Sequence, residues 1–142
     1  MTQQNKKINI SQELERAKDC LKSAELLMSH GQYADAVSRL YYYVYHNIRA
    51  LLLSRGFEPK THEETLRLLG LHFIKPGIFE PGLSHSFAKL MKYRGEADYN
   101  PSYVFTKEDY DDFKRESDLL NSQIIEFLQK EGLINKSGTR DQ

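Results

Sequence analysis

The stretch of this sequence best equipped for chemistry is YRGEADYNPSYVFT, residues 93–106, which holds one arginine, two carboxylates and three tyrosines. Arg94 could stabilise negative charge that develops on a phosphate. Asp98 and Tyr99 carry groups that could move a proton. A purely local interpretation is that Arg94 pairs with Asp98 near a helix end while the tyrosines pack against the fold. An exposed ion pair contributes about 1 kcal/mol or less, so stability alone is a modest reason for this cluster, and Arg94, Asp98 and Tyr99 remain candidate catalytic residues beside the local interpretation.

Three other positions could serve the same chemistry. Arg39 and His46 are seven residues apart, which places them two turns apart on one helix face, where a phosphate could lie between them. His62 stands at a predicted helix start, where it either joins the same cleft or makes a local hydrogen bond. Arg39, His46 and His62 therefore join Arg94 as candidate phosphate-binding residues, and His46 is also a candidate catalytic residue.

Several motifs of other enzyme classes are missing from the sequence. It has no glycine-rich phosphate loop, no HExxH motif, no paired-cysteine zinc spacing and no Glu-x-x-His pair of the di-iron bundles. We therefore expect neither a metal nor a cofactor.

The composition indicates one ordered domain. The chain has 142 residues, 39% of them hydrophobic, and its 20 basic and 20 acidic residues cancel. A neutral total argues against binding of duplex DNA by bulk charge, but it allows a local basic site. The single cysteine, Cys20, favours a reducing, cytoplasmic setting. Apolar runs are too short to span a membrane. We place the domain at residues 10–132, with polar flexible tails at 1–9 and 133–142.

The hydrophobic pattern has a helical period throughout. Gly31 and Gly56 are placed to end helices, and Thr61 and Thr106 to begin them. We predict an all-α fold, an antiparallel four-helix bundle with an additional short helix. The predicted helices run from a Ser11 cap to Gly31, from Tyr33 to Arg55, from Thr61 to Leu71, from Leu83 to Arg94, and onward from Thr106.

The second helix, SRLYYYVYHNIRALLLSR at 38–55, is unusually aromatic. One side of it carries a stripe that should face the core, and its back carries Tyr42, His46 and Leu53 together with charged residues. Amphipathic side chains of this kind suit a second contact. The helix is either packed on both sides within one chain, or it forms a homodimer interface through Tyr42, His46 and Leu53.

Two segments carry a family likeness. LYYYVYHNIRALLLSRGFEPKTHEETL (40–66) resembles the long helix and the Gly-x-x-Pro-Lys-Thr-His signature of one branch of the HEPN (higher eukaryotes and prokaryotes nucleotide-binding) domains. YRGEADYNPSYVFTKEDYDDF (93–113) resembles the Arg-x-x-Ala-Asp-Tyr stretch of the same branch. With both motifs in order, the resemblance covers roughly residues 10–130.

The resemblance implies a helical bundle that forms a homodimer. In many members it implies a metal-independent ribonuclease, often a toxin paired with a minimal nucleotidyltransferase as antitoxin. Their chemistry rests on Arg-x(4–6)-His, in which the Arg corresponds to Arg94. The positions for the His are Tyr99, Asn100 and Pro101 here. Because the ordinary pKa of tyrosine is about 10, Tyr99 is a poor general base.

We therefore expect an HEPN-type RNA- or nucleotide-binding protein, a toxin-like partner of a nucleotidyltransferase. Its ribonuclease activity is either lost or depends on a histidine such as His46 or His62 facing Arg94. The alternative is a non-enzymatic helical dimer that acts as a protein-interaction module through its second helix.

Overall fold

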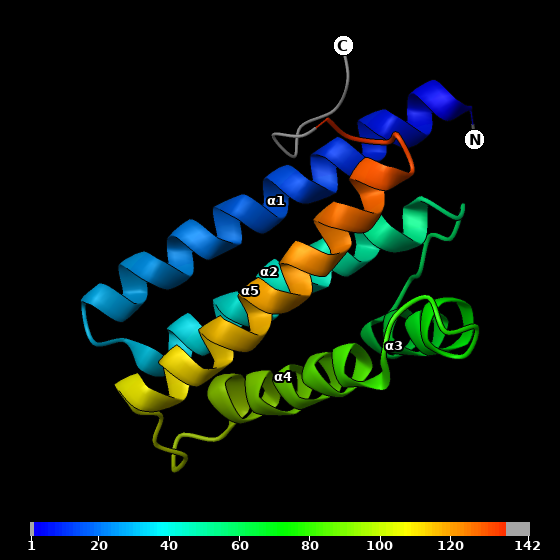
Figure 1. The fold of residues 1–142 in the computed structure, drawn as a ribbon. Coiled ribbons are helices and arrows are strands. Elements are labelled where there is room, and N and C mark those ends of the chain that lie inside the picture. Colours follow the sequence, from blue (N-terminus) through cyan, green and yellow to red (C-terminus); the bar gives the residue numbers. More distant parts are fainter. Residues whose placement is uncertain (1, 136–142) are drawn as a thin grey trace.

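The computed structural model describes residues 2–135 of the chain. Within this range the fold is all-α and contains no strand. Four long helices form an antiparallel bundle, and in the chain a short helix with a π-helical turn connects the second of these helices to the third (Figure 1). The elements are α1 (Gln3–Ser29), α2 (Tyr33–Leu53), α3 (His62–Leu69), η1 (Gly70–Ile74), α4 (Pro81–Tyr99) and α5 (Lys107–Lys130). The predicted fold class is confirmed.

α2 is the central helix of the bundle, because it contacts α1, α3, α4 and α5. α2 is therefore buried on more than the one face that carries its apolar stripe. Tyr41, Tyr43 and Leu53 are 0%, 4% and 4% exposed. The prediction that Leu53 lies on an open back of this helix is wrong, because other parts of the same chain cover it. Tyr42 and His46 do keep part of their surface exposed.

The first helix begins at Gln3, well before the predicted Ser11 cap. The Thr2 hydroxyl accepts the Asn5 N–H at 3.1 Å and caps the helix, as an N-cap threonine does. Ile10 is fully buried, which ties the early turns to the core. Residues 3–9, assigned to a tail from the sequence, are thus part of α1.

The third long helix also differs from its prediction. α4 begins with Pro81 in its first turn and continues through Tyr99, about five residues past the predicted end at Arg94. Asn100, the residue that ends it, has an extended conformation (φ −120°, ψ 94°). Pro101 follows, and a proline disfavours the helical conformation of the residue before it. Arg94, Asp98 and Tyr99 therefore lie on a helix rather than in a connecting loop.

The remaining helix boundaries follow the sequence signals closely. Gly56, with φ +83°, adopts the left-handed conformation just after α2, which costs glycine little. Thr106 caps α5 in a complete capping box with Asp109. Leu133 and Ile134, assigned to a tail from the sequence, are 4% and 3% exposed and pack with the core. Among residues 2–135, no helix is both long and apolar enough to cross a membrane.

Candidate functional site

Arg94 lies in the second half of α4 and points toward α2. Its guanidinium carbon lies 5.2 Å from the ring centroid of Tyr41 and 6.0 Å from that of Tyr42. Both distances are within the range of cation–π attraction. Its Nη1 lies 3.6 Å from the Asp98 carboxylate, one turn farther along α4. The Arg94 side chain is 16% exposed, and its Nε is buried without a hydrogen-bond partner. Arg94 is thus held in position with donor capacity unused.

His62, at the first position of α3, lies against the same rings. Its Nδ1 is 2.5 Å from the hydroxyl of Tyr41. Burial and the nearby charge of Arg94 lower the pKa of His62 from its ordinary value, so the neutral imidazole is favoured near pH 7. Burial raises the pKa of Tyr41, which keeps its phenol protonated. A protonated Tyr41 hydroxyl can donate to Nδ1, and in that tautomer the proton of His62 lies on Nε2.

His46 forms a second polar group with residues from two helices. Its Nδ1 lies 2.8 Å from Oε2 of Glu13 on α1, and the Nε of Arg49 lies 3.2 Å from Oε1 of the same carboxylate. Although burial opposes ionisation of Glu13, hydrogen bonds from His46 and Arg49 outweigh it and lower its pKa. An ionised carboxylate only accepts, so Nδ1 of His46 donates. The neutral His46 ring then has its basic lone pair on Nε2.

Aromatic rings connect the two groups. The ring centroid of Tyr45 lies 4.6 Å from that of His62 and 5.3 Å from that of His46. At the other end, Arg39 lies over Tyr42, with 4.8 Å between its guanidinium carbon and the ring centroid. We call the following partly exposed residues the Arg94 face: Arg39, Tyr42, Tyr45, His46, His62 and Arg94.

Most of the predicted site residues thus converge, although they come from three helices. Tyr99 is the exception. It is 77% exposed and takes part in none of the ring contacts found among residues 2–135. Glu13 was missed by the sequence analysis, because nothing in the sequence pairs a carboxylate of α1 with His46. The three-residue spacing of His46 and Arg49 on one helix face was the available signal for Arg49.

An open pocket of about 500 Å³ lies beside His46. Its walls come from the start of α1, the end of α2 and the segment before α3. It shares Glu13 and Arg49 with the His46 group. The lining residues are Asn9, Gln12, Glu13, Arg49, Leu53, Glu58, Pro59 and Lys60. Among the described residues, no group of three or more His, Cys, Asp or Glu side chains could hold a metal ion.

Comparison with known proteins shows the family of this chain. The HEPN domain matches residues 10–120, most of the chain. The chain belongs to the HEPN domain family. It is 30% identical over 117 residues to a Methanocaldococcus jannaschii protein named "Putative toxin MJ0605", covering 82% of this chain and 87% of that protein. A "UPF0332 protein" of Thermotoga maritima is 29% identical over 103 residues, 72% of this chain and 78% of the relative.

A further Methanocaldococcus jannaschii relative, named "Putative toxin MJ0142", is 32% identical over 96 residues. That match covers 68% of this HEPN chain and 65% of the relative. All residues of the Arg94 face, and also Glu13, lie within the range that matches the HEPN domain. The HEPN match therefore covers both polar groups of the site.

Proposed function

We propose that this HEPN protein is a toxin-like protein that binds RNA through the Arg94 face. The observation that carries the proposal is the state of Arg94, a guanidinium held by Tyr41 and Asp98 whose buried Nε has no partner. Arginine binds phosphate with a rigid fork of donors. A phosphate oxygen at the exposed part of the guanidinium, where Nη1 lies 3.6 Å from Asp98, would receive hydrogen bonds that the folded chain itself leaves unmade.

His62 supplies a second donor to the same phosphate. In the tautomer whose Nδ1 accepts from the Tyr41 hydroxyl, Nε2 of His62 carries the proton. In this tautomer His62 is a hydrogen-bond donor and not a general base. The Tyr41–His62–Arg94 group is therefore suited to binding a phosphate rather than to removing the proton of a ribose hydroxyl.

The tyrosines of the Arg94 face provide surfaces for bases. Tyr42 and Tyr45 lie on α2 between Arg39 and His46. Stacking of a base on an aromatic side chain contributes about 1–3 kcal/mol and tolerates every base. Cations interleaved with rings fit a flexible single strand, because its bases are free to turn toward the protein. We therefore propose single-stranded RNA as the ligand.

Cleavage of the RNA, where it occurs, uses His46 as the base. The Glu13 carboxylate holds Nδ1 of His46 as a donor, which leaves Nε2 able to accept a proton. A carboxylate that sets the tautomer of a catalytic histidine in this way is a common arrangement. Tyr99 takes no part in this proposal, because it lies away from the Arg94 face.

The test compares wild type with Arg94→Gln in EDTA, using fluorescence anisotropy for binding and denaturing gels for cleavage of a single-stranded RNA. Loss of one charge-assisted phosphate contact, about 1.5–3 kcal/mol, weakens binding at least tenfold. The slope of log affinity against log salt falls by about 0.7. The matched control is Arg115→Gln on α5, whose side chain is 72% exposed and contacts Asp112.

Equal effects of the two substitutions would refute RNA binding at the Arg94 face. RNA cleavage that disappears in His46→Gln while binding persists assigns His46 as the base. If the wild type binds RNA but does not cleave it, the protein has lost ribonuclease activity. Circular dichroism of each variant separates loss of a contact from loss of the fold.

The partners belong to the same proposal. We place a nucleotidyltransferase antitoxin over the Arg94 face, where it would exclude RNA, in the reducing cytoplasm that the single Cys20 favours. We also propose a homodimer that uses the exposed edges of Tyr42 and His46. Analytical ultracentrifugation of the Tyr42→Ala, His46→Ala double variant tests the dimer, which should dissociate. Leu53, the third residue of the predicted dimer interface, is buried within the chain and is left out of the proposed interface.

A further inference from the structure

A second hollow lies between the later half of α4 and the first turns of α5. Its volume is about 200 Å³, and it is lined by Lys89, Tyr93, Tyr103, Asp109, Asp112 and Phe113. It lies on a different side of α4 from the Arg94 face. Neighbouring residues of a helix point about 100° apart, so Tyr93 contacts Phe113 of α5 at 5.2 Å between ring centroids while Arg94 faces α2.

Three aromatic rings form the walls of this hollow. Tyr93 lies between Phe113 and Tyr103, with 5.8 Å between the centroids of Tyr93 and Tyr103. The faces of such rings attract cations. Two lysines of the chain already use them. Nζ of Lys89 lies 5.3 Å from the Phe113 centroid, and Nζ of Lys92 lies 5.6 Å from the Tyr93 centroid. The environment is therefore one that cations occupy.

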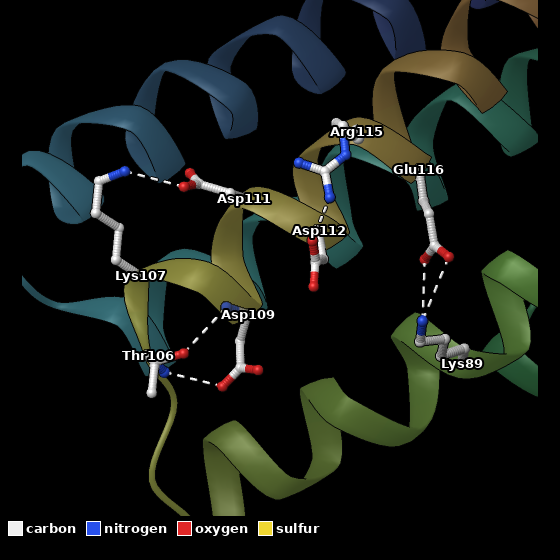
Figure 2. Close-up of polar contacts among 8 residues, drawn as sticks. All are labelled: Lys89, Thr106, Lys107, Asp109, Asp111, Asp112, Arg115 and Glu116. Atoms are coloured by element: carbon white, nitrogen blue, oxygen red, sulfur yellow. Dashed lines mark hydrogen bonds and ion pairs between the residues drawn. The ribbon is translucent and has the colours of Figure 1, made fainter.

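Two carboxylates complete the hollow. Asp109 and Asp112 project from α5 toward α4 (Figure 2). Oδ2 of Asp109 accepts the Thr106 N–H at 2.9 Å, and Oδ1 of Asp112 contacts Arg115. A carboxylate offers about four acceptor positions, so each of these groups can bind a further donor.

The lining of the hollow is acidic. Asp109 and Asp112 carry two negative charges against the one positive charge of Lys89, a net charge of −1, whereas the whole chain is neutral. Apolar surface lies close by in the chain, since Tyr99 and Val104 are 77% and 78% exposed. A field of this sign repels the phosphates of RNA and attracts a basic protein segment. The two sides of α4 thus favour ligands of opposite charge.

We propose that this hollow binds an arginine side chain of a partner protein. The guanidinium lies against the rings of Tyr93 and Tyr103, whose planes meet at 67°, and donates hydrogen bonds to Asp109 and Asp112. Arginine suits the site better than lysine, because its planar group both stacks on aromatic faces and binds carboxylates through two donors. Lys89, which an ion pair to Glu116 holds at 3.3 Å, is the internal cation that the ligand must displace or adjoin.

The experiment is a titration of the full chain with the peptide acetyl-Gly-Arg-Gly-Arg-Gly-Arg-Gly-amide, followed by NMR chemical shifts and calorimetry. We expect shifts at the residues that line the hollow. Asp112→Asn should weaken binding about tenfold, the effect of removing one charge-assisted hydrogen bond. Lys89→Met should tighten it severalfold, because it removes the competing cation. A peptide with citrulline in place of arginine keeps the shape without the charge, and it should not bind.

The matched control is Glu126→Gln near the other end of α5. Glu126 is exposed and pairs with Lys130, so the substitution makes the same charge change away from the hollow. Equal weakening by Asp112→Asn and Glu126→Gln would mean general charge attraction and would overturn the proposal. So would equal binding of the citrulline peptide, absence of peptide binding at millimolar concentration, or single-stranded RNA that shifts the same residues.

Discussion

Glu13 is the residue whose replacement tests the structure most directly. It joins α1 to α2 through Oε2 to His46 (2.8 Å) and Oε1 to Arg49 (3.2 Å), and its side chain is only 16% exposed. In Glu13→Gln the amide oxygen can accept one of these two hydrogen bonds. The amide NH₂ then faces the other donor, so that hydrogen bond is lost or His46 must move its proton to Nε2 in order to accept from the amide.

The size of the effect follows from these two bonds. A hydrogen bond to a charged group contributes about 1.5–3 kcal/mol. Removal of one partner from a fully buried ion pair costs about 3–5 kcal/mol. Because Glu13 keeps some exposure, we expect a loss of about 2–3 kcal/mol in the free energy of unfolding. With a urea m-value of about 2 kcal/mol per molar, the midpoint moves down by about 1–1.5 M.

The effect should also depend on pH. The pKa of Glu13 is lowered in the folded protein, because the hydrogen bonds from His46 and Arg49 outweigh the opposing effect of burial. A depressed folded pKa stabilises the fold above the unfolded pKa, and this stabilisation disappears as pH falls through the folded value. The difference in the free energy of unfolding between wild type and Glu13→Gln is therefore largest near pH 7 and becomes smaller below about pH 4.5.

Urea denaturation followed by circular dichroism at pH 7 and at lower pH measures both quantities. The control is Glu15→Gln, because Glu15 lies on the same helix but is 63% exposed, and its contact with Lys18 is long at 3.7 Å. A loss below about 0.5 kcal/mol for Glu13→Gln, the usual range for surface substitutions, would refute the proposed bridge between α1 and α2. A loss that stays constant with pH would refute the ionised carboxylate.

Two further predictions concern single side chains. NMR titration of the His62 ring should give a midpoint below the ordinary value of about 6.5, because burial and the charge of Arg94 lower its pKa. Arg94→Gln should raise that midpoint, since it removes the charge that disfavours the imidazolium. An unchanged midpoint would contradict an electrostatic interaction between His62 and Arg94. Thr106→Ala should cost about 1 kcal/mol in urea denaturation, because it removes the acceptor of the Asp109 N–H at 3.1 Å from the α5 cap; Ser122→Ala, an exposed hydroxyl in the same helix, should cost less.

The sequence was informative about helix ends wherever one residue type has a strong local preference. Gly56 takes the left-handed conformation after α2, and Thr106 caps α5. The end of α4 was predicted too early, although Pro101 carried the signal that places it at Asn100. The π-helical turn at Gly70–Ile74 could not be predicted, because a shift from one hydrogen-bond register to the next depends on how the turn packs.

Part of the candidate site could also be predicted from the sequence. Arg39, His46, His62 and Arg94 were singled out by residue type, spacing and resemblance. Their mutual geometry was not predictable, because they lie on three different helices. The role of Tyr99 depended on its residue type and on resemblance, and the side chain, which is 77% exposed, takes part in no ring contact with the Arg94 face.

What the sequence by itself determined is the all-α fold, most helix boundaries and membership of a family whose motifs include Arg94. These properties depend on local periodicity, on capping and on motif order, all of which are written in consecutive residues. The tertiary structure alone decided that Glu13 sets the tautomer of His46, that the Tyr41 hydroxyl meets Nδ1 of His62, and that Asp109 and Asp112 line one hollow with Tyr93. Each is a contact between helices, so it depends on how whole elements pack around α2, and neighbouring residues in the chain carry no record of that packing.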